Sequence, residues 1–559
     1  MYHRYDDLEL WRTAFSRFAS IGGNTVLFFA SPVQKLGSYE ASGQVTWQLR
    51  KRALDQCLDQ GSSCVASALA DYQRSGSALP LKGIYYFESA EDYEKYFDAN
   101  CLGLNKAIHL PQEFEASYTL KLFRIFMPHT SGASCVTETS SYDVIFVKQL
   151  VDRQGKVVDG NLIALLEGAK AGMQLYLGTP DFPRVVENGA ASNWNLDVES
   201  FGVYHNFVYQ TYFMWRYKKG FTGIDSFAGV YQSFEFDLSL PASSYTNQAL
   251  SEYVYEAELL HLLLPGRRYA ISPYWISNIV MLNQASGGAR SKSELLQNVR
   301  LSLERLIDGK IDVIAPQDSR GTGKTLLYGD SESEIDLFSV DPALRSYPDQ
   351  SIFTPGPVSA NFLASTAELY ASARAALDAR KAANSNLQTE LWGNVEAFEG
   401  VPLDGSALPL TTKQRLDQAI RHYGKSVDRL ISFMWDDLFI RRGSDGALYE
   451  LIQKDATRPI PTLAFWNDSN SVPGLVVEGY HLASSSGAKV NVTWYDVNGG
   501  LRFESVPLSL GWIWNRATTS QPGRHTIWVP LNTGSRASWW VYVSITDGTG
   551  KESGIVMLR

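Results

Sequence analysis

Apolar residues recur at intervals of three and four at the start of the chain, and a short apolar run follows them. The recurring positions are Leu8, Trp11, Phe15, Phe18 and Ile21. This spacing places their side chains on one face of a helix, so it predicts a helix here. The glycines at 22–23 mark the end of that helix. The run NTVLFFASPV at 24–33 then predicts a strand. A helix followed by a strand is half of a βα repeat.

The same alternation resumes after residue 160 and continues to residue 437. Helical patterns occupy residues 161–172, 205–219, 247–264, 293–309, 359–383 and 413–427. Apolar runs that end in polar or aromatic residues occupy 173–183, 227–237, 268–275, 311–319, 387–399 and 428–437. Strands that alternate with helices predict a parallel sheet. Because no dinucleotide-binding motif follows the first strand, the pattern favours an α/β fold of the (β/α)8 TIM-barrel type, whose active sites lie at the C-terminal ends of the strands.

Two segments depart from this rhythm. Residues 40–160 contain separate strand-like runs, such as KGIYYFES and SYDVIFVKQL, and predict an insertion into the N-terminal half of a barrel domain at 1–460. Residues 461–559 contain short alternating runs separated by Gly, Asn, Ser and Asp. They predict an all-β sandwich accessory domain of the immunoglobulin or fibronectin type. Such a domain either binds carbohydrate or packs against the barrel, and the sequence leaves both roles open.

All four cysteines of the chain, Cys57, Cys64, Cys101 and Cys135, fall inside the predicted insertion. An even, clustered set fits one or two disulfides and an oxidising compartment, periplasmic or extracellular. Four separate buried thiols are the alternative. No CxxC pair is present, so a zinc site is not expected. The residues after Met1 do not form a signal peptide, so an exported protein would have lost its leader before this sequence begins.

Composition narrows the class of partner. Of the 559 residues 12% are aromatic, with 14 Trp and 29 Tyr, and such rings often line grooves for sugars. The net charge is −9 and no run of Lys or Arg occurs, so no nucleic-acid partner is expected. No stretch reaches the roughly 20 apolar residues that span a bilayer. The aromatic residues are compatible with a polysaccharide or oligosaccharide partner, although the packing of a large core accounts for most of them.

The segment IDVIAPQDSRGTGKT at 311–325 ends like a phosphate-binding loop. Such a loop needs a glycine five residues before the glycine of its Gly-Lys-Thr end, because the amides that cradle the phosphate begin there. Asp318 holds that position, and its carboxylate would repel a phosphate. The segment therefore predicts no nucleotide cofactor. Gln317 and Asp318 instead end a strand, where they can bind sugar hydroxyls or orient a catalytic group.

Carboxylates end four of the predicted strands. They are Glu235, Asp318, Glu396 and Asp436, the last followed by Asp437. Glycosidic cleavage needs two carboxyl groups, one protonated and one ionised, and aromatic surroundings can move their pKa values apart. The aromatic residues near these acids are Tyr231, Tyr274, Trp275, Trp392 and Trp435. Together they predict a stacking surface for sugar rings, although each alone is compatible with core packing.

Other kinds of catalytic site find little support. Neither an HExxH motif for a metal nor a GxSxG motif for a serine nucleophile is present in the sequence, and His261 and His422 lie in predicted helices. The predicted chemistry therefore needs neither a metal nor a cofactor.

The segments GVYQSFE, ISPYW, IAPQDSRG, LWGNVEAFE and ISFMWDD, in this order, resemble a bacterial family of glycoside-hydrolase-like TIM barrels known as domain of unknown function 4434. The resemblance covers residues 161–455, and its W-x-N-x-E motif contains Asn394. It implies an exported glycoside hydrolase that acts on a bacterial or environmental polysaccharide. The alternatives are a non-catalytic polysaccharide-binding protein and a scaffold of an envelope or exopolysaccharide system.

The resemblance also implies roles for single residues. Counted back from residues 428–437 as the eighth strand, Glu235 follows strand four and Glu396 follows strand seven. This placement is similar to that of retaining glycosidases, and it implies that Glu235 is the general acid/base and Glu396 the nucleophile, with Asp318 or Asp436 as a replacement for either. A carboxyl separation of about 5–5.5 Å would predict retention of configuration, and one of about 6.5–9.5 Å would predict inversion.

The chain departs from the pattern of these families at three positions. Val230 and Ser319 stand where the family has Trp and Gly, and Phe234 stands where such glycosidases have Asn before the acid/base. These departures concern contacts with the ligand rather than the fold.

Overall fold

A computed structural model describes most of the chain. The described residues are 7–89, 104, 106–110, 119–131, 139–152, 154, 156–187, 190–241, 244–325, 350–353, 360–402, 406–423, 426–444, 446–454, 459–467, 474–482, 487–508, 513–515, 524–531, 536–550, 553 and 556–558. Two compact units are present. The first consists of Met1–Phe234 and Ser244–Ile271, and the second of Glu235–Ser243 and Ser272–Arg559.

Parallel strands lie in both units, and all seven of them fall on predicted strands. The first unit contains β1 (Thr25–Leu27), β10 (Gln174–Thr179), β13 (Phe227–Gln232) and β14 (Arg268–Ile271), paired in that order. The second contains β15 (Val313–Ile314), β16 (Glu390–Val395) and β17 (Arg429–Ser432), also paired in order. Strands and helices alternate along the chain, so the parallel α/β class is confirmed. The described residues supply seven of the eight strands that a (β/α)8 barrel needs.

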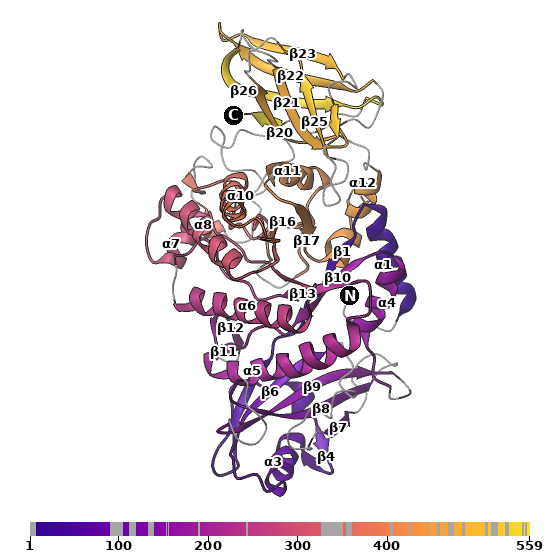
Figure 1. Cartoon of the computed structure of the whole chain (residues 1–559), viewed down its shortest axis with the longest axis vertical. Helices are drawn as coiled ribbons and strands as arrows, with labels where there is room; N and C mark the ends of the chain where they lie inside the picture. The colour runs from indigo at the N-terminus through magenta and orange to yellow at the C-terminus, as the bar shows by residue number, and fades with distance from the viewer. Residues whose placement is uncertain are drawn as a thin grey trace. The chain divides into compact units, whose positions relative to one another are not determined.

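Most helices also lie where the apolar spacing predicts them. They are α1 (Leu8–Ser20), α4 (Gly160–Lys170), α6 (Ser244–Leu263), α8 (Lys292–Asp308), α10 (Thr366–Ala383) and α11 (Lys413–Tyr423). Ser291 and Ser365 begin α8 and α10 with capping boxes, in which the serine and a glutamate three residues later satisfy each other's backbone amides. The two helices pack against each other (Figure 1).

Two helical segments differ from the prediction. The helix expected at 205–219 is α5 (Phe201–Phe207) followed by a π-helix at Val208–Phe221. The short helix α7 (Ile279–Ser286) was not predicted, because its apolar residues follow one another without helical spacing. Its start is set by Asn278, whose side chain accepts the amide of Met281.

Five strands from the predicted insertion at 40–160 and one strand that precedes it, β2, form a separate sheet in the first unit. Its strands, in the order β3-β2-β6-β9-β8-β7, are β2 (Gln34–Tyr39), β3 (Val45–Trp47), β6 (Leu81–Ser89), β7 (Lys106–Leu110), β8 (Thr119–Pro128) and β9 (Tyr142–Val151). The runs KGIYYFES and SYDVIFVKQL are thus confirmed as strands. The small helices α2 (Arg52–Asp55) and α3 (Cys64–Arg74) contribute buried residues to the same core as this sheet.

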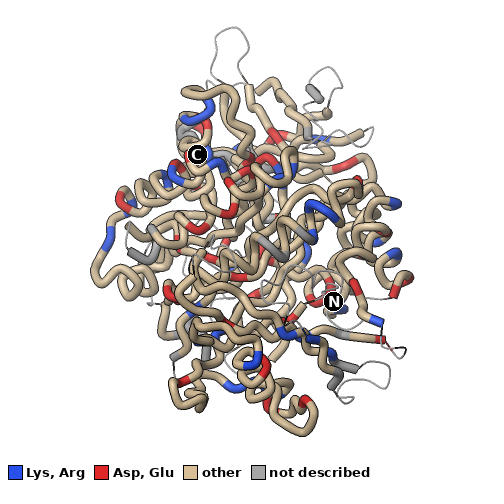
Figure 2. Tube along the Cα trace, turned by 60° about the horizontal axis from the view of Figure 1, so that its bottom comes forward, with Lys and Arg blue, Asp and Glu red and all other residues tan. Residues whose placement is uncertain are grey.

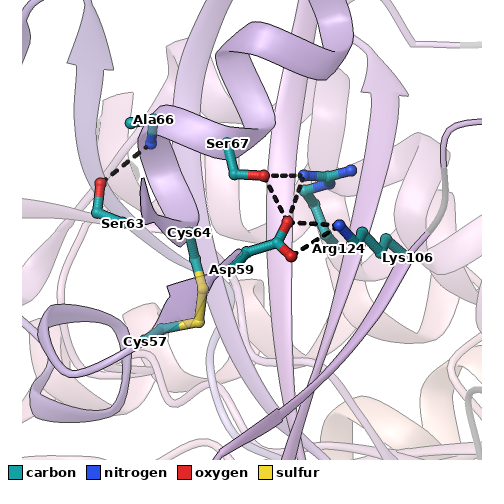
Figure 3. Close-up of a disulfide and its surroundings, with 8 residues drawn as sticks. All are labelled: Cys57, Asp59, Ser63, Cys64, Ala66, Ser67, Lys106 and Arg124. Atoms are coloured by element: carbon teal, nitrogen blue, oxygen red, sulfur yellow. Dashed lines mark hydrogen bonds and ion pairs between the residues drawn. A yellow bond between two sulfur atoms is a disulfide. The ribbon is translucent and has the colours of Figure 1, made fainter. Parts of the chain in front are cut away.

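A disulfide joins Cys57 to Cys64 at the start of α3 (Figure 3). The hairpin of β4 (Leu58–Asp59) and β5 (Ser62–Ser63) lies between the two cysteines. Inside this loop Asp59 accepts hydrogen bonds from Lys106, at 2.6 and 2.7 Å, and from Ser67 (Figure 3). One predicted disulfide is therefore confirmed, and Cys101 and Cys135 lie outside the described residues.

The C-terminal residues form two four-stranded antiparallel sheets that share one hydrophobic core. One sheet contains β20 (Ile460–Asn467), β21 (Gly474–Tyr480), β25 (Arg524–Val529) and β24 (Ile513–Asn515); the other contains β23 (Leu501–Pro507), β22 (Lys489–Asp496), β26 (Arg536–Thr546) and β27 (Val556–Leu558). The shared core includes Trp466 and Val477 from the first sheet and Trp494 and Val543 from the second. The immunoglobulin or fibronectin type of this arrangement stays a prediction.

Charges of both signs are mixed along the chain. Figure 2 shows Lys and Arg interspersed with Asp and Glu over the described elements. Within the described part of the chain, no helix has the length and apolar character needed to cross a membrane.

Candidate active site

Strand β16 points three of the predicted site residues to one face. Side chains of a strand alternate between its faces, so Trp392, Asn394 and Glu396 share one side. Gly393 lies between them and faces α11, because a Cβ atom there would come within 2.5 Å of the Tyr423 ring. The three side chains therefore point away from α11, on the face where the C-terminal end of the strand presents Glu396.

Glu396 is buried, with 3% of its surface exposed. The backbone amide of Gly321 donates to its Oε2 at 2.6 Å. Only glycine fits at that position, because a Cβ atom would lie 2.6 Å from the carbonyl oxygen of Phe398. Burial and the nearby charge of Asp318 raise the pKa of Glu396 to about 8. The glycine-rich segment that looked like a phosphate loop thus covers a carboxyl group instead.

Asp318 ties the end of β15 to the end of β16. It is 1% exposed, and its Oδ1 accepts the backbone amides of Arg320 at 3.2 Å and of Glu396 at 3.3 Å. The hydroxyl of Tyr423 donates to its Oδ2 at 3.0 Å. Burial raises the pKa of Asp318, while the Arg320 guanidinium opposes that rise. With three donors and one cation around it, this carboxylate holds Glu396 in position.

Arg320 was not singled out in the sequence, yet it is fully buried beside these acids. Its guanidinium forms ion pairs with Asp318 at 3.8 Å and with Glu399 at 3.1 Å. It also donates to the carbonyl oxygen of Glu396. The positive charge of Arg320 opposes the rise in the pKa of Asp318 and also opposes the rise in the pKa of Glu396.

Glu235 belongs to the same network through Gln317. The Gln317 side-chain amide donates to Glu235 Oε1 at 2.6 Å and to the carbonyl oxygen of Ser272 at 3.3 Å. The backbone of Gln317 pairs with that of Asn394, two residues before Glu396. Glu235 is therefore connected through Gln317 to the strand that precedes Glu396.

Asn394 presents an unsatisfied polar atom to this network. Its Nδ2 donates to Ser272 Oγ at 2.9 Å, and it is 7% exposed. Its Oδ1 is buried and has no hydrogen-bond partner among the described residues. A buried oxygen of this kind is costly unless a ligand or water satisfies it. This atom therefore suits an acceptor for a hydroxyl group.

Asp237 is a further buried acid near the site that sequence reasoning missed. Its Oδ1 accepts the backbone amide of Ser239 at 2.8 Å, while its Oδ2 has no partner among the described residues. Burial raises the pKa of Asp237 to about 6, and the charge of Lys324 opposes the rise. Lys324 opposes the rise at Glu396 as well. Asp237 lies two residues after Glu235 in the extended run FEFD, so both side chains point to the same face. This spacing was the signal in the sequence from which Asp237 could have been found.

Three predicted aromatic residues of the second unit are buried. Lys324 Nζ lies 3.7 Å from the centre of the Tyr274 ring. Trp275 meets the ring of Tyr370 edge-on at 4.7 Å. Trp392 donates its indole hydrogen to Glu390 at 2.6 Å. In this conformation all three serve packing, and their part in stacking sugars stays a prediction.

The other predicted residues lie elsewhere. Trp435 and Asp436 are half-buried in a π-helix at Trp435–Ile440 after β17, where Trp435 stacks on Phe439 at 5.3 Å. Tyr231 belongs to the first unit and meets Phe29 edge-on at 5.3 Å. No group of three or more His, Cys, Asp or Glu side chains that could hold a metal ion occurs among the residues that the structure describes.

One protein-family model matches the chain. It carries the description "Domain of unknown function (DUF4434)" and matches residues 144–442, which are 299 of the 559 residues. A search of curated proteins found no match.

Several solved structures are similar to the chain at low identity. A protein of Bacteroides thetaiotaomicron proposed to be an α-L-fucosidase is 14% identical, over 54% of this chain and 74% of its own, with a TM-score of 0.32. The endo-β-1,4-mannanase of Thermotoga petrophila is 9% identical, over 71% of this chain and 81% of its own, with a TM-score of 0.30. The β-mannanase of the blue mussel Mytilus edulis is 9% identical, over 77% of this chain and 97% of its own, with a TM-score of 0.27.

Proposed function

The chain belongs to the DUF4434 family, and from this premise we propose that it is an exported glycoside hydrolase that cleaves a polysaccharide through Glu235 and Glu396. The observation that carries the proposal is the network at the strand ends. In it Gln317 binds Glu235 at 2.6 Å and pairs with the strand that carries Glu396. Two carboxyl groups in different surroundings are what acid-assisted glycosidic cleavage requires. The disulfide Cys57–Cys64 supports an oxidising, exported location.

The surroundings suggest which acid holds the proton. Burial and Asp318 raise the pKa of Glu396 to about 8, which suits a general acid at neutral pH. Glu235 is half-buried and accepts a hydrogen bond from the side-chain amide of Gln317 at 2.6 Å. We therefore assign Glu396 as the proton donor to the leaving group and Glu235 as the ionised partner. This is the reverse of the order that the family resemblance implies.

The test is glycan cleavage by matched variants. Wild-type protein, Glu235→Gln, Glu396→Gln and the exposed control Glu258→Gln are incubated with a panel of polysaccharides, and released reducing ends are measured. Glu396→Gln keeps the shape of the site but cannot donate the proton, so a loss of about 10²–10⁴-fold is expected, with a comparable loss for Glu235→Gln. The control should retain full activity. Full activity in either site variant would exclude that acid from the mechanism.

Binding without cleavage is the second candidate function. It is favoured by the burial of Glu396 and by exposed apolar side chains on β22 and β23, where Tyr495, Leu501 and Phe503 are 46%, 62% and 66% exposed. Such a surface suits attachment to a polysaccharide or to an envelope partner. Glycan binding that persists in both Gln variants, together with no hydrolysis by the wild type, would establish this function in place of the first.

A further inference from the structure

A serine, a histidine and a glutamate form a hydrogen-bonded chain in the first unit. The Oγ atom of Ser131 lies 3.2 Å from His205 Nδ1. On the other side of the ring, His205 Nε2 lies 2.5 Å from Glu252 Oε2. Ser131 follows β8, His205 is in α5, and Glu252 is in α6, so three elements converge on this chain. None of the three residues belongs to the acid network of the second unit.

The glutamate determines how the histidine can act. An ionised carboxylate only accepts hydrogen bonds, so the bond to Glu252 requires a hydrogen on His205 Nε2. In the neutral imidazole the other nitrogen, Nδ1, then carries a lone pair and can accept the hydroxyl hydrogen of Ser131. This is the order of roles that activates a serine: an acid orients the base, and the base takes the proton of the nucleophile.

The position of Ser131 is held by buried contacts. Asn206, which is 2% exposed, donates its Nδ2 to the carbonyl oxygen of Pro128 at 3.0 Å and to that of Thr130 at 2.6 Å. Gly202 allows the same segment to approach α5, because a Cβ atom there would lie 1.9 Å from the carbonyl oxygen of His129. The segment before Ser131 is thus fixed against the helix that carries His205.

The hydroxyl of Ser131 is nevertheless reachable. Ser131 is exposed, whereas the side chains of His205 and Glu252 are each 13% exposed. Tyr255 packs on the His205 ring at 4.3 Å between centroids, and its hydroxyl lies within hydrogen-bonding reach of Ser131. A tyrosine hydroxyl at this place can donate to an oxygen that gains negative charge when Ser131 attacks a carbonyl.

We propose that Ser131, His205 and Glu252 form a second hydrolytic site, which cleaves carboxylic esters. Ser131 Oγ bonds to the carbonyl carbon of the ester while its proton passes to His205 Nδ1. The ester C–O bond then breaks, and the alcohol leaves with that proton. Water attacks the acyl group on Ser131 and gives a proton to Nδ1, which returns it to Oγ as the carboxylic acid departs. The net reaction is ester plus water to acid plus alcohol.

The test uses p-nitrophenyl acetate and a fluorophosphonate probe on the full chain. Wild type is expected to release p-nitrophenol and to carry the phosphonyl group on Ser131, located by peptide mass spectrometry. Ser131→Ala should lose the labelling and about 10²–10⁴-fold of the rate. Because Ser131 is exposed, this variant should fold, which its far-UV circular dichroism spectrum verifies.

Two further variants probe the base and its orienting acid. His205→Asn should lose activity as Ser131→Ala does, and Glu252→Gln should lose part of it. Ser140→Ala, at a second exposed serine, should leave ester hydrolysis and labelling unchanged. The exposed control Glu258→Gln should retain ester hydrolysis. Ester hydrolysis and glycan cleavage are measured separately, so failure of the glycosidase proposal and failure of this one are distinguishable. Labelling that is absent in wild type or unchanged in Ser131→Ala would overturn the proposal.

Discussion

At the scale of single residues, backbone conformation explains one departure from the family pattern. Ser319 stands where the family has glycine, and its φ of 57° lies in the left-handed region that favours glycine. The residue is fully buried, and its carbonyl oxygen accepts the amides of Lys324 and Thr325, which close the loop over Glu396. The chain therefore keeps a strained conformation to hold this loop.

Replacing Ser319 by glycine should stabilise the second unit. Relief of the left-handed conformation is worth about 1–2 kcal/mol, and the added freedom of the unfolded chain offsets roughly 0.5–1 kcal/mol of it. The free energy of unfolding of Ser319→Gly, measured by urea titration, should thus rise by up to about 1.5 kcal/mol. Ser319→Ala removes the hydroxyl but keeps the strain, so it should give no gain. A gain as large in the alanine variant would show that strain is not the cause.

The residues of the site were predictable in part, for a physical reason. Glu235, Gln317, Asn394 and Glu396 stand at or next to the ends of strands that the apolar pattern reveals, and parallel strands bring such ends together. Arg320 and the Ser131 site were not predictable, because their partners lie far away in sequence. Arg320, for example, meets Glu399 across 79 positions.

At the scale of elements, the pattern of apolar residues predicted the parallel strands. It did not predict helices whose apolar residues are not spaced at helical intervals. The apolar run that contains β16 predicts a strand, and the structure buries all of its residues from Leu391 to Val395. The eight-residue helix α7 was not predicted, because a run of four apolar residues is equally compatible with a strand. The π-helix after α5 has no distinct sequence signature, and its residues predict an ordinary helix.

The element that depends most on a single bond is the hairpin between Cys57 and Cys64. The disulfide closes a short loop, which limits the freedom of the unfolded chain there. The double variant Cys57→Ser/Cys64→Ser should lower the free energy of unfolding of the first unit by about 2–3 kcal/mol, measured by denaturant titration without reductant. The exposed control Ser62→Ala should have no effect. An unchanged midpoint in the double variant would contradict a stabilising role.

At the scale of the whole molecule, each compact unit buries carboxyl groups whose pKa values are raised. In the second unit these include Glu396 and Asp237. In the first unit Glu256 is fully buried on α6 and accepts hydrogen bonds from Tyr204, from Tyr269 at 2.7 Å and from Gln232 at 3.2 Å. Burial raises the pKa of Glu256 from 4.5 to about 7 despite these donors. No pattern in the sequence marks this acid, since it stands among apolar residues in an ordinary helix.

The raised pKa of Glu256 makes the stability of the chain depend on pH with a definite sign. The folded state holds the proton more tightly than the unfolded state, so the stabilisation is complete below pH 4.5 and is lost as the pH rises through about 7. The shift corresponds to about 3 kcal/mol. Between pH 4.5 and pH 8 the free energy of unfolding of wild type should therefore fall by about that much more than that of Glu256→Gln, which carries no titrating group there. Glu258→Gln, on the exposed side of the same helix, should follow wild type. Parallel curves for wild type and Glu256→Gln would mean that Glu256 is ionised in the folded protein, with its charge stabilised by the three donors alone.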